Sequence, residues 1–172
     1  MARNIEIKAK VNDLEKQTAK VKLLCDSGPH QLYQEDTFFH VPSGRLKLRE
    51  FGDGSGELIQ YNRPDSAVPV PSDYFIYPTK NPVVLKEVLT NALSVRAVVR
   101  KNRDVYMIGQ TRIHFDRVEG LGRFIELEVV LKRDGDTDTG MIIAENLMKQ
   151  LYIKEYDLIT SVYVDLLELI NN

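Results

Sequence analysis

Charged residues occur at every second position in two short stretches of the chain. Arginine and lysine alternate with leucine at Arg45, Lys47 and Arg49, and glutamate alternates with apolar residues at Glu126 and Glu128. Successive side chains of a β-strand point to opposite faces, so each row is expected on one face of a strand. Arginine and lysine bind phosphate oxygens, whereas clustered carboxylates suit Mg²⁺ or Mn²⁺. The two rows together predict metal-assisted phosphoryl or nucleotidyl transfer.

Other predicted strands add charged residues to rows of the same kind. These residues are Glu6, Lys8, Arg63, Lys101, Arg103, Arg112, His114 and Asp116. If the charged faces point inward in a closed sheet, the lumen holds several cations and several carboxylates. Buried charge is costly without a partner, so such a lumen requires a charged ligand, counter-ions or water. The obvious ligand is a polyphosphate.

A solvated sheet face is the simpler interpretation of these rows, because antiparallel sheets commonly expose one charged face to water. Two features of the sequence weigh against it. The rows contain little of the serine, threonine and glutamine expected on a passive surface, and the intervening segments include helices that can cover the apolar faces. The sequence leaves both interpretations open and favours the enclosed one.

The elements that must position these rows are mostly strands joined by short turns. Alternation and turn residues predict strands at 4–11, 31–41, 45–51, 57–63, 73–77, 95–102, 104–109, 111–118 and 124–132. Helices are expected at 14–26, 82–93, 140–151 and 158–170. Strands joined by short turns pair antiparallel, and a sheet this long tends to close. We therefore expect an α+β fold, an eight-stranded antiparallel β-barrel or tunnel with helices packed outside, as a single domain over residues 1–172.

Composition and charge limit the classes of function. The 172 residues include 23 Lys and Arg against 25 Asp and Glu, a net charge of −2, which argues against a generally basic nucleic-acid-binding protein. No apolar run approaches the roughly 20 residues that span a bilayer, and no signal-peptide core is present. Cys25 is the one cysteine, so no intrachain disulfide is expected, and the predicted compartment is the cytoplasm. We expect a monomer or homodimer with no nucleic-acid or membrane partner.

The histidines give a weaker signal than the charged rows. His30, His40 and His114 show no spacing typical of metal ligands. His114 alternates with Arg112 and Asp116 and therefore shares their face. It is a candidate contact to phosphate.

Several segments, taken together, match the motifs of one known family. They are Ile5–Val11, Asp36–Phe39 with Gly44–Arg49, Lys101-x-Arg103, and Asp116–Glu128. In that order they resemble the N-terminal Glu-x-Glu-x-Lys strand, the phosphate-gripping hairpin, the later basic pair and the metal-binding strand of the CYTH superfamily, the triphosphate tunnel metalloenzymes. The resemblance covers nearly the whole chain. It is closest to the branch that contains class IV adenylyl cyclase-like and thiamine triphosphatase-like proteins.

The resemblance implies a tunnel that binds a linear triphosphate together with Mg²⁺ or Mn²⁺. It implies phosphate binding by Lys8, Arg45, Lys47, Arg49, Arg63, Lys101 and Arg103, and a metal site at Glu6, Glu126 and Glu128. Lys8 and Asp116 become candidate catalytic residues that position the attacking group or water. Asn4 stands where the family has the first glutamate of its N-terminal motif. Its amide oxygen can coordinate a metal but brings no charge.

Three functions remain open at this point. The first is metal-dependent hydrolysis of tripolyphosphate, a nucleoside triphosphate or thiamine triphosphate, because no base or ribose pocket is recognisable. The second is a class IV adenylyl cyclase, in which the 3′-hydroxyl of ATP attacks the α-phosphorus and cyclic AMP and pyrophosphate form. The third is a non-catalytic polyphosphate-binding module, suggested by Asn4.

Overall fold

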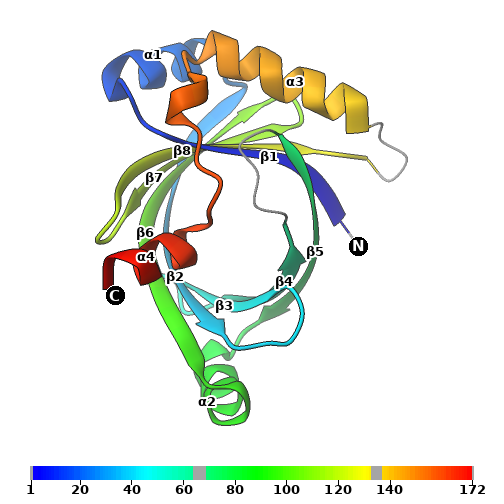
Figure 1. Cartoon of the computed structure of the whole chain (residues 1–172), viewed down its shortest axis with the longest axis vertical. Helices are drawn as coiled ribbons and strands as arrows, with labels where there is room; N and C mark the ends of the chain where they lie inside the picture. Colours follow the sequence, from blue (N-terminus) through cyan, green and yellow to red (C-terminus); the bar gives the residue numbers. More distant parts are fainter. Residues whose placement is uncertain (1, 64–68, 133–136, 172) are drawn as a thin grey trace.

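Eight antiparallel strands close into a barrel in the order β1-β5-β4-β3-β2-β6-β7-β8 (Figure 1). The computed structural model describes residues 2–63, 69–132 and 137–171. The strands are β1 (Ala2–Lys10), β2 (Ser27–Phe39), β3 (Arg45–Phe51), β4 (Gly56–Asn62), β5 (Val70–Thr79), β6 (Val95–Ile108), β7 (Thr111–Val118) and β8 (Gly122–Val130). The predicted fold, a closed eight-stranded antiparallel barrel with helices outside, is confirmed.

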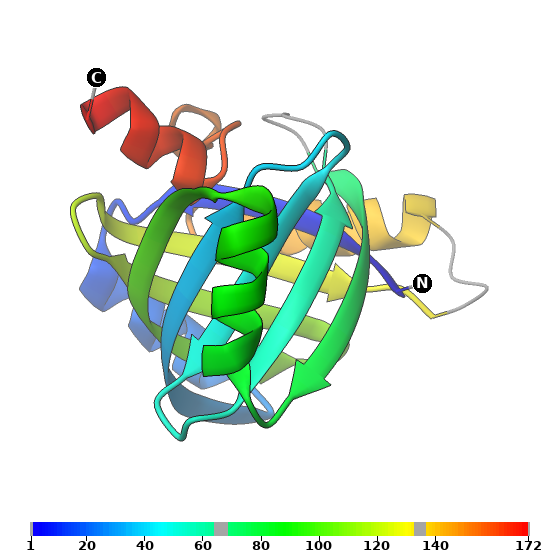
Figure 2. The same cartoon turned by 90° about the horizontal axis from the view of Figure 1, so that it is seen from below.

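The helices lie on the outside of this barrel and at one end of it. They are α1 (Leu14–Leu24), α2 (Pro82–Leu93), α3 (Thr137–Gln150), a 3₁₀ turn η1 (Glu155–Asp157) and α4 (Tyr163–Asn171). Figure 1 shows α1 and α3 over the β1 and β8 side, and Figure 2 shows α2 running along the opposite side of the barrel. Among the described helices, none has both the length and the apolar character needed to cross a membrane.

Local signals in the sequence account for several of the boundaries. The Asp13 side chain accepts a hydrogen bond from the Lys16 backbone N–H at 3.0 Å and caps α1. Pro82 occupies the first turn of α2, where its missing N–H costs nothing. Gly44 precedes the Arg45 row with φ +65°, and an added Cβ would lie 2.8 Å from a backbone carbonyl oxygen of β4. Glycine is therefore required at this turn.

The main core lies between the barrel wall and the helices. Its buried barrel residues include Ile5, Ile7, Ile113, Ile125 and Leu127, which pack with Val21 of α1 and Leu147 of α3. These apolar side chains alternate with the charged rows, so packing them outward under the helices turns the charged rows inward. A second cluster, which includes Phe38, Phe124 and Tyr163, packs the start of α4 against one end of the barrel.

Several expected strand boundaries differ from the structure; β2, for example, begins at Ser27 rather than at 31. The predicted strands at 95–102 and 104–109 form one strand, β6, because Arg103 pairs with Leu32 of β2 on one side and with Asp116 of β7 on the other. The predicted strand at 73–77 is longer, since β5 keeps pairing with β1 and β4 over its whole length.

The expected helix at 158–170 begins later, at Tyr163. The preceding residues follow β1 instead: Leu158 forms a bridge with Ala9, and the Ile159 N–H donates to the Lys8 carbonyl at 2.9 Å. These backbone contacts fix where α4 starts. They also place Tyr163 over the lumen.

Candidate active site

A cavity of about 350 Å³ runs through the lumen of the barrel. Its lining includes all of the predicted site residues except Arg45 and Asp116. Residues of opposite charge face one another across paired strands: Asp36 is opposite Arg49, and Lys8 is opposite Glu126. The interpretation of the charged rows as a solvated outer face is therefore wrong.

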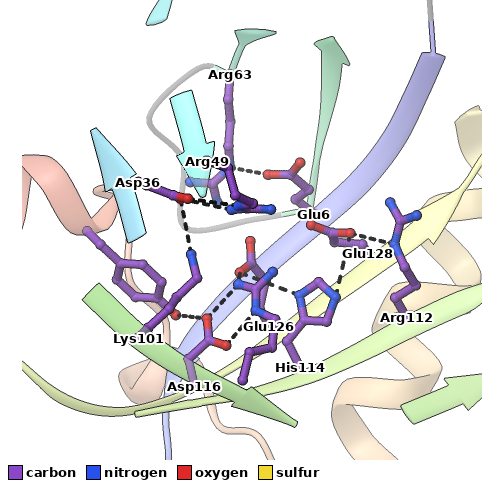
Figure 3. Close-up of polar contacts among 12 residues, drawn as sticks. Glu6, Asp36, Arg49, Arg63, Lys101, Arg112, His114, Asp116, Glu126 and Glu128 are labelled. Atoms are coloured by element: carbon purple, nitrogen blue, oxygen red, sulfur yellow. Dashed lines mark hydrogen bonds and ion pairs between the residues drawn. The ribbon is translucent and has the colours of Figure 1, made fainter. Parts of the chain in front are cut away.

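One side of the cavity carries three cations around a single carboxylate. The Asp36 side chain, 1% exposed, accepts hydrogen bonds from Arg49 at 2.7 and 2.8 Å and from Lys101 at 3.3 Å (Figure 3). It also accepts one from Lys47 at 3.0 Å. We call Lys47, Arg49 and Lys101 the cationic wall. Burial by itself would raise the pKa of Asp36, but Arg49, Lys101 and Lys47 hold it well below the ordinary value.

The cationic wall carries more positive charge than Asp36 can neutralise. The pKa of Lys101 is lowered to about 7, chiefly by burial; Asp36 opposes this shift, and the nearby Arg103 and Arg49 contribute to it. Burial likewise lowers the pKa of Lys47, with Arg49 next in effect. Two lysines with depressed pKa values, facing the same cavity, indicate a site that lacks an anion.

Arg103 connects the cationic wall to the carboxylates on the other side. Its guanidinium donates to both oxygens of Asp116 at 2.6 Å and to Glu126 at 3.1 Å. The Tyr163 hydroxyl also donates to Asp116, at 2.8 Å. Burial would raise the pKa of Asp116, but Arg103 lowers it to about 2. Asp116 is therefore an ionised carboxylate whose two oxygens are already occupied.

The opposite side of the cavity carries three carboxylates from two adjacent strands, Glu6 on β1 and Glu126 and Glu128 on β8. We call these three residues the acidic wall. Glu6 and Glu128 are direct partners in the β1–β8 register. The pKa of Glu6 is raised to about 7, chiefly by burial and next by the charges of Glu128 and Glu126. Nearby cations and His114 instead lower the pKa values of Glu126 and Glu128, so Glu6 is the carboxylate of the acidic wall whose charged form is least favoured.

Each carboxylate of the acidic wall has a cationic neighbour. Glu6 pairs with Arg63 at 3.0 Å, and Glu128 accepts from Arg112 at 2.8 Å. The Arg63 Nη1 atom is buried without a hydrogen-bond partner among the residues the structure describes. A buried unused donor on a cation beside the cavity is a position where a phosphate oxygen can bind.

The remaining predicted cations lie at the end covered by α4. The Lys8 ammonium group lies 3.7 Å from the centroid of the Tyr163 ring, and burial lowers the pKa of Lys8. Arg45 donates to the Arg63 carbonyl at 3.1 Å and to Asp165 of α4 at 3.0 Å. Arg45 is therefore anchored to α4 outside the main cavity, and it lies apart from the other predicted phosphate ligands.

A family model described as the CYTH domain matches residues 2–163. The chain belongs to the CYTH domain family. None of the curated protein sequences with which the chain was compared matches it.

Solved structures share the CYTH fold of this chain at low sequence identity. PH1012 protein from Pyrococcus horikoshii is 24% identical, with a TM-score of 0.84 over 95% of this chain and 98% of that chain. A "putative adenylate cyclase" from Vibrio parahaemolyticus is 20% identical, with a TM-score of 0.74 over 96% and 97%. HpAC1 from Hippeastrum, described with a dominant triphosphatase activity, is 17% identical, with a TM-score of 0.61 over 92% and 90%. At these identities the likeness shows the fold alone.

The donor atoms of this CYTH lumen fit a divalent cation. The acidic wall offers carboxylate oxygens on two adjacent strands, which suit Mg²⁺ or Mn²⁺. Asn4, 1% exposed, also lines the cavity, and its Oδ1 atom has no hydrogen-bond partner in the described part of the chain. An oxygen lone pair buried without a partner is a further free ligand.

Sequence reasoning missed three contributors to this site. Asp36 lay inside a quoted motif, and its alternation with Phe38 could have marked it as inward-facing. Tyr163 was predicted only as part of a packing helix, because its place over the lumen depends on the backbone pairing of Leu158 and Ile159. His114 was expected at phosphate, but the structure places it between Glu126 and Glu128.

Proposed function

We propose that this protein is a metal-dependent hydrolase of a linear triphosphate. One observation carries the proposal: a single cavity of about 350 Å³ is lined by the cationic wall on one side and the acidic wall on the other. A triphosphate chain complements the first wall and a divalent cation complements the second. The membership of the chain in the CYTH family supports the same reaction class.

The cationic wall would bind the phosphate chain. Charge-assisted hydrogen bonds from Lys47, Arg49 and Lys101 to phosphate oxygens stabilise negative charge that builds up during phosphoryl transfer. Asp36 holds the three cations in place before the substrate arrives, so little reorganisation is needed on binding. Arg63 contributes the buried donor Nη1 from the neighbouring strand end.

The acidic wall would hold Mg²⁺ or Mn²⁺. When bound, such an ion neutralises charge on the phosphate chain and lowers the pKa of a water molecule. Lys8 lies beside Glu126 and has a depressed pKa, so it can orient the attacking water or donate to a phosphate oxygen. We assign Asp116 a positioning role, because both of its oxygens are engaged in fixing Arg103.

Apolar residues in the cavity lining support an organic triphosphate over bare tripolyphosphate. Leu32, Phe51, Ile76 and Val105 line the cavity, and Phe51 lies at the end of β3 opposite to Arg45, which pairs with α4. We call these four residues the apolar collar. An apolar surface beside a phosphate site suits a flat ring, as in ATP or thiamine triphosphate.

The apolar collar also supports adenylyl cyclase activity as the second candidate. The same cavity would serve both reactions, and the phosphorus that faces the attacking oxygen decides between them. Hydrolysis is placed first because HpAC1 carries a cyclase name together with a dominant triphosphatase activity.

The proposal is tested by product analysis. The purified full chain is incubated with Mg²⁺ or Mn²⁺ and, separately, tripolyphosphate, ATP and thiamine triphosphate, and all products are resolved by ion-exchange chromatography. Orthophosphate release that disappears in Glu126→Gln supports the hydrolase. Cyclic AMP with pyrophosphate from ATP supports the cyclase instead. Tight triphosphate binding without turnover under either ion identifies a non-catalytic binding module and overturns both enzymes.

We also propose that residues 1–172 act as one domain in the cytoplasm, as a monomer or homodimer. The cations that could bind a polyanion are enclosed in the lumen, which supports a small-molecule triphosphate over nucleic acid or a membrane surface. Sedimentation equilibrium of the purified chain distinguishes the two oligomeric states.

A further inference from the structure

The imidazole of His114 is buried between two carboxylates, at ion-pair distance from each. His114 lies on β7 directly opposite Glu126 of β8, and its side chain is 4% exposed. Its Nδ1 atom lies 3.8 Å from Glu126 Oε2, and its Nε2 atom lies 3.8 Å from Glu128 Oε2 (Figure 3). Both distances exceed the range of a hydrogen bond. Nδ1 is also without any hydrogen-bond partner within the described residues.

Either of these separations suits two donors that share one metal ion. Two donors that are each about 2.1 Å from one ion lie roughly 3–4 Å apart. One ligand atom from each of His114, Glu126 and Glu128 can be chosen so that all three lie within 4.8 Å of one another. Only one nitrogen of the ring can bind a given ion. The other then faces the second carboxylate, an arrangement that commonly orients a metal-bound histidine.

A phosphate contact, the role expected from the sequence, fits the surroundings of His114 poorly. The anionic groups nearest the ring are Glu126 and Glu128, and a phosphate beside them would be repelled. Arg103 reaches Glu126 and Arg112 reaches Glu128, while the Nδ1 atom of the ring has no hydrogen-bond partner among the described residues. A cation is attracted to the same position, so the surroundings favour a metal over an anion.

We propose that His114 is a nitrogen ligand of the divalent-metal site, together with Glu126 and Glu128. In this chain Asn4 replaces a glutamate of the family motif, and His114 adds one nitrogen ligand to the oxygen ligands that remain. Imidazole nitrogen suits Mn²⁺ and later transition metals better than Mg²⁺, which prefers oxygen ligands. The site should therefore bind Mn²⁺ and Co²⁺ in preference to Mg²⁺. This ligand set deepens the function proposed above and rests on it for the presence of a metal ion.

The test is electron spin-echo envelope modulation of Mn²⁺ bound to the full chain, recorded without substrate. Wild type should show the coupling of a directly bound imidazole nitrogen, and His114→Gln should lose it. We expect the Mn²⁺ affinity of His114→Gln to fall by about 10–100-fold, by titration calorimetry, and its Mg²⁺ affinity by less than about threefold. The matched control, His30→Gln at an exposed position of β2, should retain both the coupling and the affinity.

A measurement on wild type alone keeps the inference testable if His114→Gln does not fold. Uniform ¹⁵N-histidine labelling should convert the ¹⁴N modulation into the ¹⁵N pattern. Bound Mn²⁺ that shows no nitrogen coupling, coupling that survives in folded His114→Gln, or failure of wild type to bind Mn²⁺ would each overturn the ligand assignment. A clear nitrogen coupling without turnover of any triphosphate would instead overturn the hydrolase proposal and leave the ligand set standing.

Discussion

The cationic wall and the acidic wall face the same cavity but neutralise their charge differently. In the cationic wall three cations share one carboxylate, Asp36. In the acidic wall each carboxylate has its own arginine, from three different strands or loops, and the carboxylates remain crowded together. The charge of the cationic wall is therefore neutralised by one carboxylate at its centre, whereas the charge of the acidic wall is neutralised by separate arginines around it. The first wall depends on a single residue and the second does not.

Burial moves the pKa of one residue in each wall toward neutrality from opposite directions. The pKa of Lys101 falls to about 7, and the pKa of Glu6 rises to about 7. Each lies where charges of its own sign gather, so each is the group most relieved by a ligand of opposite charge. A metal–triphosphate complex supplies both charges at once and makes the two walls complementary.

The largest effect should come from removing the single carboxylate of the cationic wall. Asp36→Asn leaves Lys47, Arg49 and Lys101 without a counter-charge, and we expect the free energy of unfolding to fall by about 3–5 kcal/mol. Urea denaturation measures this loss, and saturating tripolyphosphate should restore more stability to the variant than to wild type. Asp104→Asn, on the outward face of β6, is the control and should change stability little. Equal stabilities of both variants would show that the cationic wall does not depend on Asp36.

The next effect should separate turnover from binding. Glu128→Gln removes one charge of the acidic wall, and we expect turnover of the best triphosphate substrate to fall by about 100-fold. Tripolyphosphate affinity without metal should stay the same or increase, because a repulsive charge has gone. Steady-state kinetics and calorimetry measure the two quantities, with Glu145→Gln on exposed α3 as the control. Full activity of Glu128→Gln with unchanged metal dependence would show that its assigned role is wrong.

The opposite pattern is expected for the cationic wall. Arg49→Ala removes charge-assisted contacts to phosphate, which should weaken tripolyphosphate binding by about 1.5–3 kcal/mol. Lys47 and Lys101 still neutralise Asp36 in this variant, so the fold should survive. Calorimetry measures the affinity, and Arg117→Ala on the exposed face of β7 is the control. An Arg49→Ala affinity that matches this control would remove Arg49 from the phosphate site.

The sequence was sufficient to predict the fold and the charged rows that line the site. Strict alternation in β3 and β8 placed charged residues, such as Arg49 and Glu126, on one face and apolar residues on the other; the sequence favoured the charged face as the enclosed one, and the cavity lining confirms it. Alternation is a local property, so it can be read without knowing which strands are neighbours. That is why the members of both walls were predicted correctly as inward-facing.

The contacts between rows could not be predicted in the same way. Asp36 joins β2 to cations on β3 and β6, and His114 meets Glu126 and Glu128 through the β7–β8 register. Register is set by the whole closed sheet, and a one-residue shift would turn each side chain to the other face. Arg45 was grouped with the phosphate ligands from its alternation with Lys47 and Arg49 and from the family resemblance, and neither shows its contact with Asp165 of α4.

The smallest effect concerns pH and tests whether Lys101 is the titrating group of the cationic wall. With a pKa of about 7 in the ligand-free fold, Lys101 loses its proton as the pH rises above 7, whereas a bound polyanion favours the charged form. Binding therefore takes up a proton above pH 7, and affinity must fall as pH rises. Tripolyphosphate also titrates, so the measured quantity is the ratio of wild-type to Lys101→Met affinity by calorimetry. We expect this ratio to fall by roughly threefold between pH 7 and 8, and a constant ratio would exclude Lys101.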